Sequence, residues 1–164
     1  MARLLPLGLV FLVFLSCKDE KSEVVVNDTS GYEIITEKWP EKLVINASAQ
    51  TILNDWLEYN GLENSFDAIY TVENREDLSL TIENLIEKQN VLAKSTYPEK
   101  FDTPQVKSRQ KVFKTYTLKV KGDLIYRTDP QESILQMLEA YNAFRNQFNV
   151  IVNNTLDTKL ILEE

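Results

Sequence analysis

The sequence of 164 residues contains no histidine, one cysteine and four glycines. The lack of histidine removes the commonest general base, and together with the single cysteine it removes the usual zinc ligands. One cysteine cannot form an intramolecular disulfide. So few glycines argue against phosphate-cradling loops and against a turn-rich all-β fold. We therefore expect no metal and no cofactor, and no catalytic residue can be assigned.

Basic residues are also in deficit, with 18 Lys and Arg against 25 Asp and Glu and a net charge of −7. Nucleic-acid binding depends on an excess of lysine and arginine for phosphate contacts, so we expect no nucleic-acid partner. The charge is nevertheless segregated. Residues 94–121 carry eight basic and two acidic residues, a local balance of +6, which leaves −13 for the rest.

The amino terminus has the pattern of a secretory signal peptide over residues 1–16. Arg3 is followed by an apolar run from Leu4 to Leu15, and Ser16 is a small residue before a cleavage point. A helix of that length rises about 18 Å, short of a bilayer core of about 30 Å. The run therefore predicts a removable signal and not a transmembrane helix.

The segment Phe14-Leu15-Ser16-Cys17 resembles the lipobox of bacterial lipoproteins. The resemblance implies cleavage between Ser16 and Cys17, diacylglycerol on the Cys17 sulfur, and often a further, palmitate-type chain on the new amino terminus. Two or more acyl chains hold a protein stably on a membrane. The alternatives are an ordinary signal peptide that contains a cysteine and a wrongly chosen start codon.

The next residues, Lys18, Asp19 and Glu20, are similar to the acidic export signal of surface lipoproteins in Bacteroidetes-type bacteria. The resemblance implies a lipid-anchored protein of the bacterial cell envelope, expected at the outer membrane and facing the periplasm or the cell surface. A solvated charged linker is the alternative for these three residues.

The rest of the chain divides into a lipidated tether and irregular segment (17–45), a helical domain (46–155) and a tail (156–164). In the helical domain apolar residues recur at spacings of three and four in four stretches, which predicts a mainly α fold, an antiparallel four-helix bundle. The inward residues are expected to be Ala49, Ile52, Trp56, Tyr59, Phe66 and Tyr70; Leu78, Ile82, Leu85, Ile86 and Leu92; Val106, Phe113, Thr117, Val120 and Leu124; and Ile134, Met137, Tyr141, Phe144, Phe148 and Ile151.

The expected helix boundaries rest on capping signals. Asn74 or Asp77 is the expected cap of the second helix, Thr103 with Pro104 starts the third, and Asp129 with Pro130 starts the fourth. Gly61 is expected to kink or split the first helix. Residues 104–126 are ambiguous because 112–118 is β-prone. We expect a helix there, since no second strand of similar quality is available to pair with it.

Two surface patterns bear on function. In the third helix Lys107, Lys111, Lys114 and Lys121 share one arc away from the apolar face, a possible contact for an anionic partner. Complementation by the acidic residues of 41–93 is the favoured interpretation of this stripe. In the fourth helix Asn142, Asn146, Asn149 and Asn153 share an arc beside the apolar face; we interpret it as solvated, with binding to sugar hydroxyls or a partner helix as alternatives.

These patterns predict a membrane-anchored, non-catalytic binding or interaction module with a protein or glycan partner in the envelope; the oligomeric state is left open. One alternative is an enzyme that uses carboxylates alone, and the pair Glu83 and Glu87 is the only i, i+4 carboxylate pair that we single out. It would need two acids within about 10 Å in a cleft. The other alternative is a small-ligand carrier, which would need a cavity inside the bundle.

Overall fold

The computed structural model describes residues 34–154. Cys17, the cleavage point and the segment Lys18, Asp19 and Glu20 lie outside the described residues, as does the tail 156–164.

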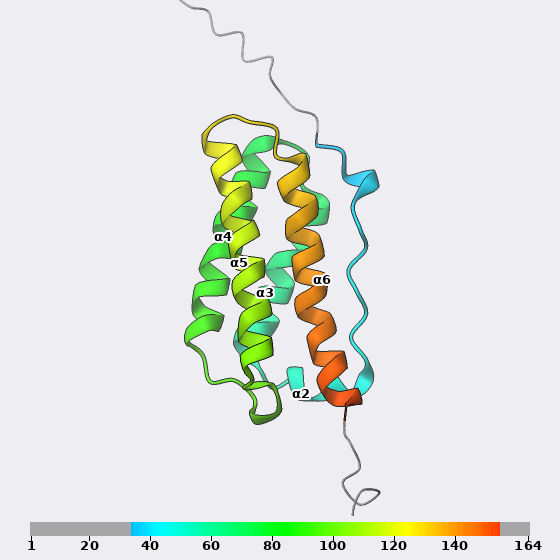
Figure 1. Ribbon diagram of the computed structural model, residues 1–164. Coiled ribbons are helices and arrows are strands. Elements are labelled where there is room, and N and C mark those ends of the chain that lie inside the picture. Colours follow the sequence, from blue (N-terminus) through cyan, green and yellow to red (C-terminus); the bar gives the residue numbers. More distant parts are fainter. Residues whose placement is uncertain (1–33, 155–164) are drawn as a thin grey trace, which may run out of the picture. The chain divides into compact units, whose positions relative to one another are not determined.

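Four long helices run alternately up and down and form an antiparallel bundle (Figure 1). They are α3 (Leu57–Asp67), α4 (Arg75–Lys94), α5 (Pro104–Ile125) and α6 (Gln131–Asn153), and the short α2 (Ala47–Leu53) lies across one end. Single 3-10 turns η2 (Thr36–Lys38), η3 (Ala68–Thr71) and η4 (Glu99–Phe101) occur in the connections. The predicted mainly α, four-helix fold is confirmed, and residues 34–154 contain no strand.

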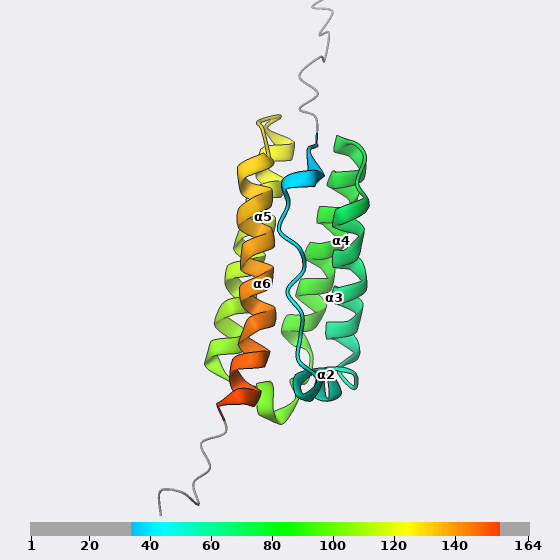
Figure 2. The same ribbon diagram turned by 90° about the vertical axis from the view of Figure 1, so that its right-hand side faces the viewer.

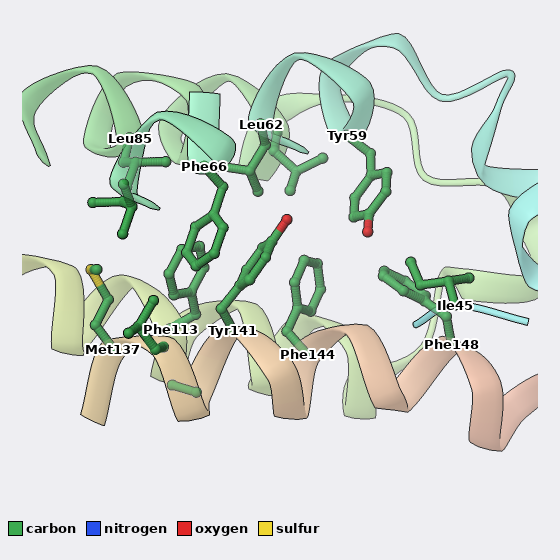
Figure 3. Close-up of a cluster of buried hydrophobic side chains, with 14 of the residues drawn as sticks. Ile45, Tyr59, Leu62, Phe66, Leu85, Phe113, Met137, Tyr141, Phe144 and Phe148 are labelled. Atoms are coloured by element: carbon green, nitrogen blue, oxygen red, sulfur yellow. The ribbon is translucent and has the colours of Figure 1, made fainter. Parts of the chain in front are cut away.

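The centre of the bundle is filled by aromatic rings from facing helices (Figure 3). Phe66 of α3 stacks on Tyr141 of α6 with ring centroids 3.5 Å apart, and Phe113 of α5 lies 4.9 Å from the same tyrosine. Tyr59 meets Phe148 edge to face at 5.3 Å. Such ring pairs add stability beyond the burial of apolar area, and these aromatic contacts connect α3, α5 and α6.

The first predicted helix is interrupted, but at a different place from the one expected. The break falls at residues 54–56, between α2 and α3, whereas Gly61 lies inside α3. The turn allows Trp56, which is 2 % exposed, to pack 4.7 Å from Tyr97, and its Nε1 donates a hydrogen bond to Ser95. The expectation that Gly61 kinks or splits the helix is therefore wrong, because burial of the Trp56 indole decides where the chain turns.

The other helix starts follow the capping residues closely. Asn74 caps α4 by accepting a hydrogen bond from the Asp77 amide, and Thr103 caps α5 with Pro104 in the first turn. Residues 104–125 are helical, and every residue expected inward on α5 is buried. The α6 helix begins at Gln131, one residue later than expected, and Asp129 accepts a hydrogen bond from its amide at 3.0 Å.

An extended segment, residues 39–46, runs along the bundle between α3 and α6 (Figure 2). We call these residues the strap. Trp39 and Ile45 are buried in the common core, and the Tyr70 hydroxyl donates to the Pro40 carbonyl at 2.9 Å. Most of the strap falls in the range predicted as tether and irregular segment, and the structure shows it packed on the helices. Within the described part of the chain, no helix is both long and apolar enough to span a bilayer.

Candidate functional site

A cavity of about 460 Å³ lies where the end of α4 and the following loop meet α5. Its lining includes three lysines, Lys107, Lys111 and Lys114, which follow one another along α5 at spacings of four and three. Helical residues at these spacings project from the same face. The rest of the lining consists of Ala93, Ser95, Thr96, Tyr97, Asp102 and Gln110. We call this cavity the lysine pocket.

Only part of the positive charge of the pocket is neutralised. Lys107 forms an ion pair with Asp102, the single acid in the lining. Lys114 donates to the amide oxygen of Asn90 at 2.5 Å, which satisfies a donor but cancels no charge. Lys111 is exposed, and its ammonium group has no hydrogen-bond or ion-pair partner among residues 34–154. The pocket therefore keeps two uncompensated ammonium groups, those of Lys111 and Lys114.

Three other lining residues of the pocket, Tyr97, Gln110 and Lys107, contact neighbouring side chains. Gln110 is 4 % exposed and accepts a hydrogen bond from the Tyr97 hydroxyl. Burial raises the pKa of Tyr97, so this hydroxyl stays protonated at neutral pH. The Lys107 ammonium lies 5.2 Å from the centre of the Tyr97 ring, and its hydrogen bond to Asp102 raises the pKa of Lys107. A neutral tyrosine and an ion pair thus lie beside the two pocket lysines that have no ion-pair partner in the described part of the chain.

The predicted lysine stripe is divided by the fold. Lys107, Lys111 and Lys114 meet at the pocket, whereas Lys121 lies elsewhere and pairs with Glu83 of α4 at 3.3 Å. The expected complementation by acidic neighbours thus reaches Lys121 but not Lys111 or Lys114. An adjoining cavity lined by Asp102, Pro104, Lys107, Ser108 and Lys111 extends the basic surface toward the start of α5.

A third cavity, at the turn between α2 and α3, contains two acids, Asp55 and Glu58. Neither side chain is buried, and neither was singled out from the sequence. The predicted carboxylate pair is not gathered in a cleft: Glu83 is held by Lys121, and Glu87 is exposed on α4. Among the described residues, no three acidic or cysteine side chains are grouped as a metal would require.

A second polar cluster is buried between α3, α6 and the strap. Glu63 accepts hydrogen bonds from the hydroxyls of Tyr59 (2.9 Å) and Tyr141 and from Nη1 of Arg145. The Arg145 side chain is only 7 % exposed, and its Nε donates to the Leu43 carbonyl of the strap at 2.7 Å. Burial foremost, and then the charge of Glu63, raises the pKa of Tyr59. All the groups of this cluster are thus occupied with one another, which indicates a structural role.

The asparagines of α6 form further hydrogen bonds between this helix and the strap. Asn142 accepts from the Leu43 amide at 2.8 Å and donates to the Glu41 carbonyl at 2.9 Å. Asn149 accepts from the Asn46 amide at 2.8 Å and donates to the Val44 carbonyl at 3.0 Å.

Asn153 also accepts from Asn46, and Asn146 alone of the four is exposed without such a contact. The interpretation of this arc as a solvated face is therefore wrong for Asn142 and Asn149, whereas Asn153 and Asn146 are exposed. Asn142 and Asn149 bind the protein's own backbone about a hundred residues away, and Asn153 accepts from the side-chain amide of Asn46.

Sequence reasoning missed Arg145, although one signal was present: this charged residue lies within the apolar stripe of α6, beside Phe144 and Phe148. Comparisons with protein-family models, with curated proteins and with solved structures gave no match.

Proposed function

We propose that this protein is a non-catalytic binding module of the bacterial cell envelope. In this proposal acyl chains on Cys17 anchor the protein, and the lysine pocket holds an anionic partner. The anchor rests on the sequence alone: the apolar run, the lipobox-like segment and the single cysteine. The expected location is the outer membrane, on its periplasmic side or at the cell surface.

One observation carries the binding role. Lys111 and Lys114 keep their charge uncompensated beside a cavity, in a chain whose net charge is −7. Among the other described lysines, Lys42 is paired with Asp67 and Lys121 with Glu83, whereas the two pocket lysines have no ion-pair partner among residues 34–154. Unpaired positive charge at a concave site attracts anions and raises their local concentration.

The alternative functions have weaker support. A carboxylate enzyme needs one acid kept protonated, usually by burial, and Asp55 and Glu58 both remain open to solvent. A carrier needs space inside the bundle, but aromatic rings fill its centre (Figure 3).

Binding is tested with the full chain purified in a nonionic detergent, using polygalacturonate, dextran sulfate and polyphosphate as anionic probes and neutral dextran as reference. We expect at least one anion to bind in preference to dextran, and binding to weaken as salt is raised from about 50 to 200 mM because charge is screened. The double charge reversal Lys111→Glu/Lys114→Glu should abolish this binding. If no anion binds better than dextran, the proposed function is wrong.

The anchor is tested separately by replacing Cys17 with serine. The unaltered protein should incorporate labelled palmitate and sediment with membranes, and the variant should do neither. Unchanged labelling and fractionation of the variant would exclude a lipid on Cys17.

A further inference from the structure

The lysine pocket offers more donors than acceptors. Lys111 has a free ammonium group, Lys114 has used one of its donors on Asn90, and Thr96 is exposed with no partner in the described part of the chain. Several of the potential acceptors are engaged: Oδ1 of Asp102 holds Lys107, and the Ser95 hydroxyl accepts from Trp56 and donates to the Leu92 carbonyl. A complementary ligand group must therefore be rich in acceptor oxygens.

The charge and the number of oxygens of the ligand group distinguish a carboxylate from a phosphate. A carboxylate carries one negative charge on two oxygens. A phosphate monoester carries about −1.5 to −2 at neutral pH on three strong acceptor oxygens. Two uncompensated ammonium groups and a hydroxyl match the phosphate better, because all three of its oxygens then find a donor.

The cavity has room for more than a phosphate group. A volume of about 460 Å³ falls in the range of about 300–1,000 Å³ typical of small-molecule sites. It exceeds what a phosphate group alone would occupy, and the remaining space accommodates a body at least as large as one sugar ring.

We propose that the lysine pocket binds a phosphate monoester on a body of about monosaccharide size, with the phosphate between Lys111 and Lys114 and within reach of Thr96. This inference rests on the proposed function and names the ligand class of the same site. The phosphate could belong to a soluble sugar phosphate or to a lipid headgroup, and the test distinguishes these sources.

Isothermal titration calorimetry of the full chain in nonionic detergent would compare glucose 6-phosphate with glucose 6-sulfate, glucuronate and glucose. Vesicles of phosphatidylcholine with and without phosphatidic acid would provide the lipid arm. We expect glucose 6-phosphate to bind at least tenfold more tightly than glucuronate, with no measurable binding of glucose. Binding only to the phosphatidic acid vesicles would support the same chemistry with a lipid source.

The double variant Lys111→Ala/Lys114→Ala should weaken phosphate binding at least tenfold. The matched control, Lys88→Ala/Lys119→Ala, removes the same charge outside the pocket lining and should change binding less than twofold. An equal loss of phosphate binding in both double variants would show that the effect comes from net charge alone, and would contradict the proposed site. Binding of glucuronate as tight as that of glucose 6-phosphate, or of glucose 6-sulfate alone, would overturn the phosphate assignment while leaving an anion-binding function in place.

Discussion

Arg145 of α6 donates a hydrogen bond from Nε to the carbonyl oxygen of Leu43, at 2.7 Å and across 102 residues of sequence. The same guanidinium also pairs with Glu63 of α3. One side chain thus joins two helices and the strap, and it does so where little water can reach. Groups buried in this way are stabilising only while all their partners are present.

We predict that Arg145→Met destabilises the fold by about 2–3 kcal/mol, measured by urea unfolding. The cost of breaking a fully buried pair is about 3–5 kcal/mol, and the side chain of Glu63 retains 18 % exposure. The loss arises mainly because the Glu63 carboxylate is left without its principal cation. In a Glu63→Gln background the same substitution should therefore cost clearly less, and equal costs in both backgrounds would contradict this coupling.

We predict that Asn142→Ala/Asn149→Ala loosens the strap without unfolding the bundle. Each substitution removes one bond to a strap amide and one to a strap carbonyl, with a net loss of about 0.5–1.5 kcal/mol per bond. Hydrogen exchange should accelerate at the amides of Leu43 and Asn46 and stay slow within α6.

Asn146→Ala is the matched control for this experiment, because Asn146 is an exposed asparagine of the same helix. It should leave the exchange of both amides unchanged. Equal acceleration by the control would mean that the strap responds to α6 as a whole and not to these two side chains.

We predict a loss of stability at alkaline pH that depends on Tyr59. Its pKa is raised well above the ordinary value of 10.0, first by burial and then by the charge of Glu63. The folded state thus keeps a proton that the unfolded state releases near pH 10. The contribution of Tyr59 is complete below about pH 10 and declines above it, by at most about 1.4 kcal/mol per pH unit.

Urea unfolding between pH 8 and 11 would test this dependence. Tyr59→Phe should be less stable than the unaltered protein at pH 8, because it lacks the bond to Glu63, but should lose less stability as the pH rises. Tyr126 is 81 % exposed, so Tyr126→Phe should keep the original slope. A slope unaffected by Tyr59→Phe would rule out this tyrosine as the source.

We predict that Gly61→Ala stabilises the protein by about 0.5–1 kcal/mol. Gly61 lies inside α3 with a negative φ, and an added methyl group would meet nothing within 4 Å. Alanine loses less backbone entropy on folding, so the midpoint of urea unfolding should rise with an unchanged slope. A lower midpoint would show that the glycine serves a purpose beyond that of a helical residue.

Local chemistry explains why the helices were predictable. Apolar spacing, the Asn74 cap of α4 and the Thr103-Pro104 start of α5 act within a few residues, and the structure has them as expected. The break before Leu57 was not predictable in the same way. It depends on Trp56 reaching Ser95 and Tyr97, which lie about forty residues further along the chain.

The features of the candidate site also separate into those set by neighbouring residues and those set by tertiary contacts. The sequence by itself determined the four amphipathic helices, the excess of positive charge on α5 and the lipobox-like cysteine, because each is a property of neighbouring residues. Only the tertiary structure decided that Lys121 is neutralised by Glu83 while Lys111 and Lys114 border a cavity. It also decided that three asparagines of α6 bind the strap. The physical reason is that charged and amide groups pair with whatever lies close to them in space. Helical periodicity specifies which residues share one face of a helix, but it does not specify which residues of other segments lie opposite that face.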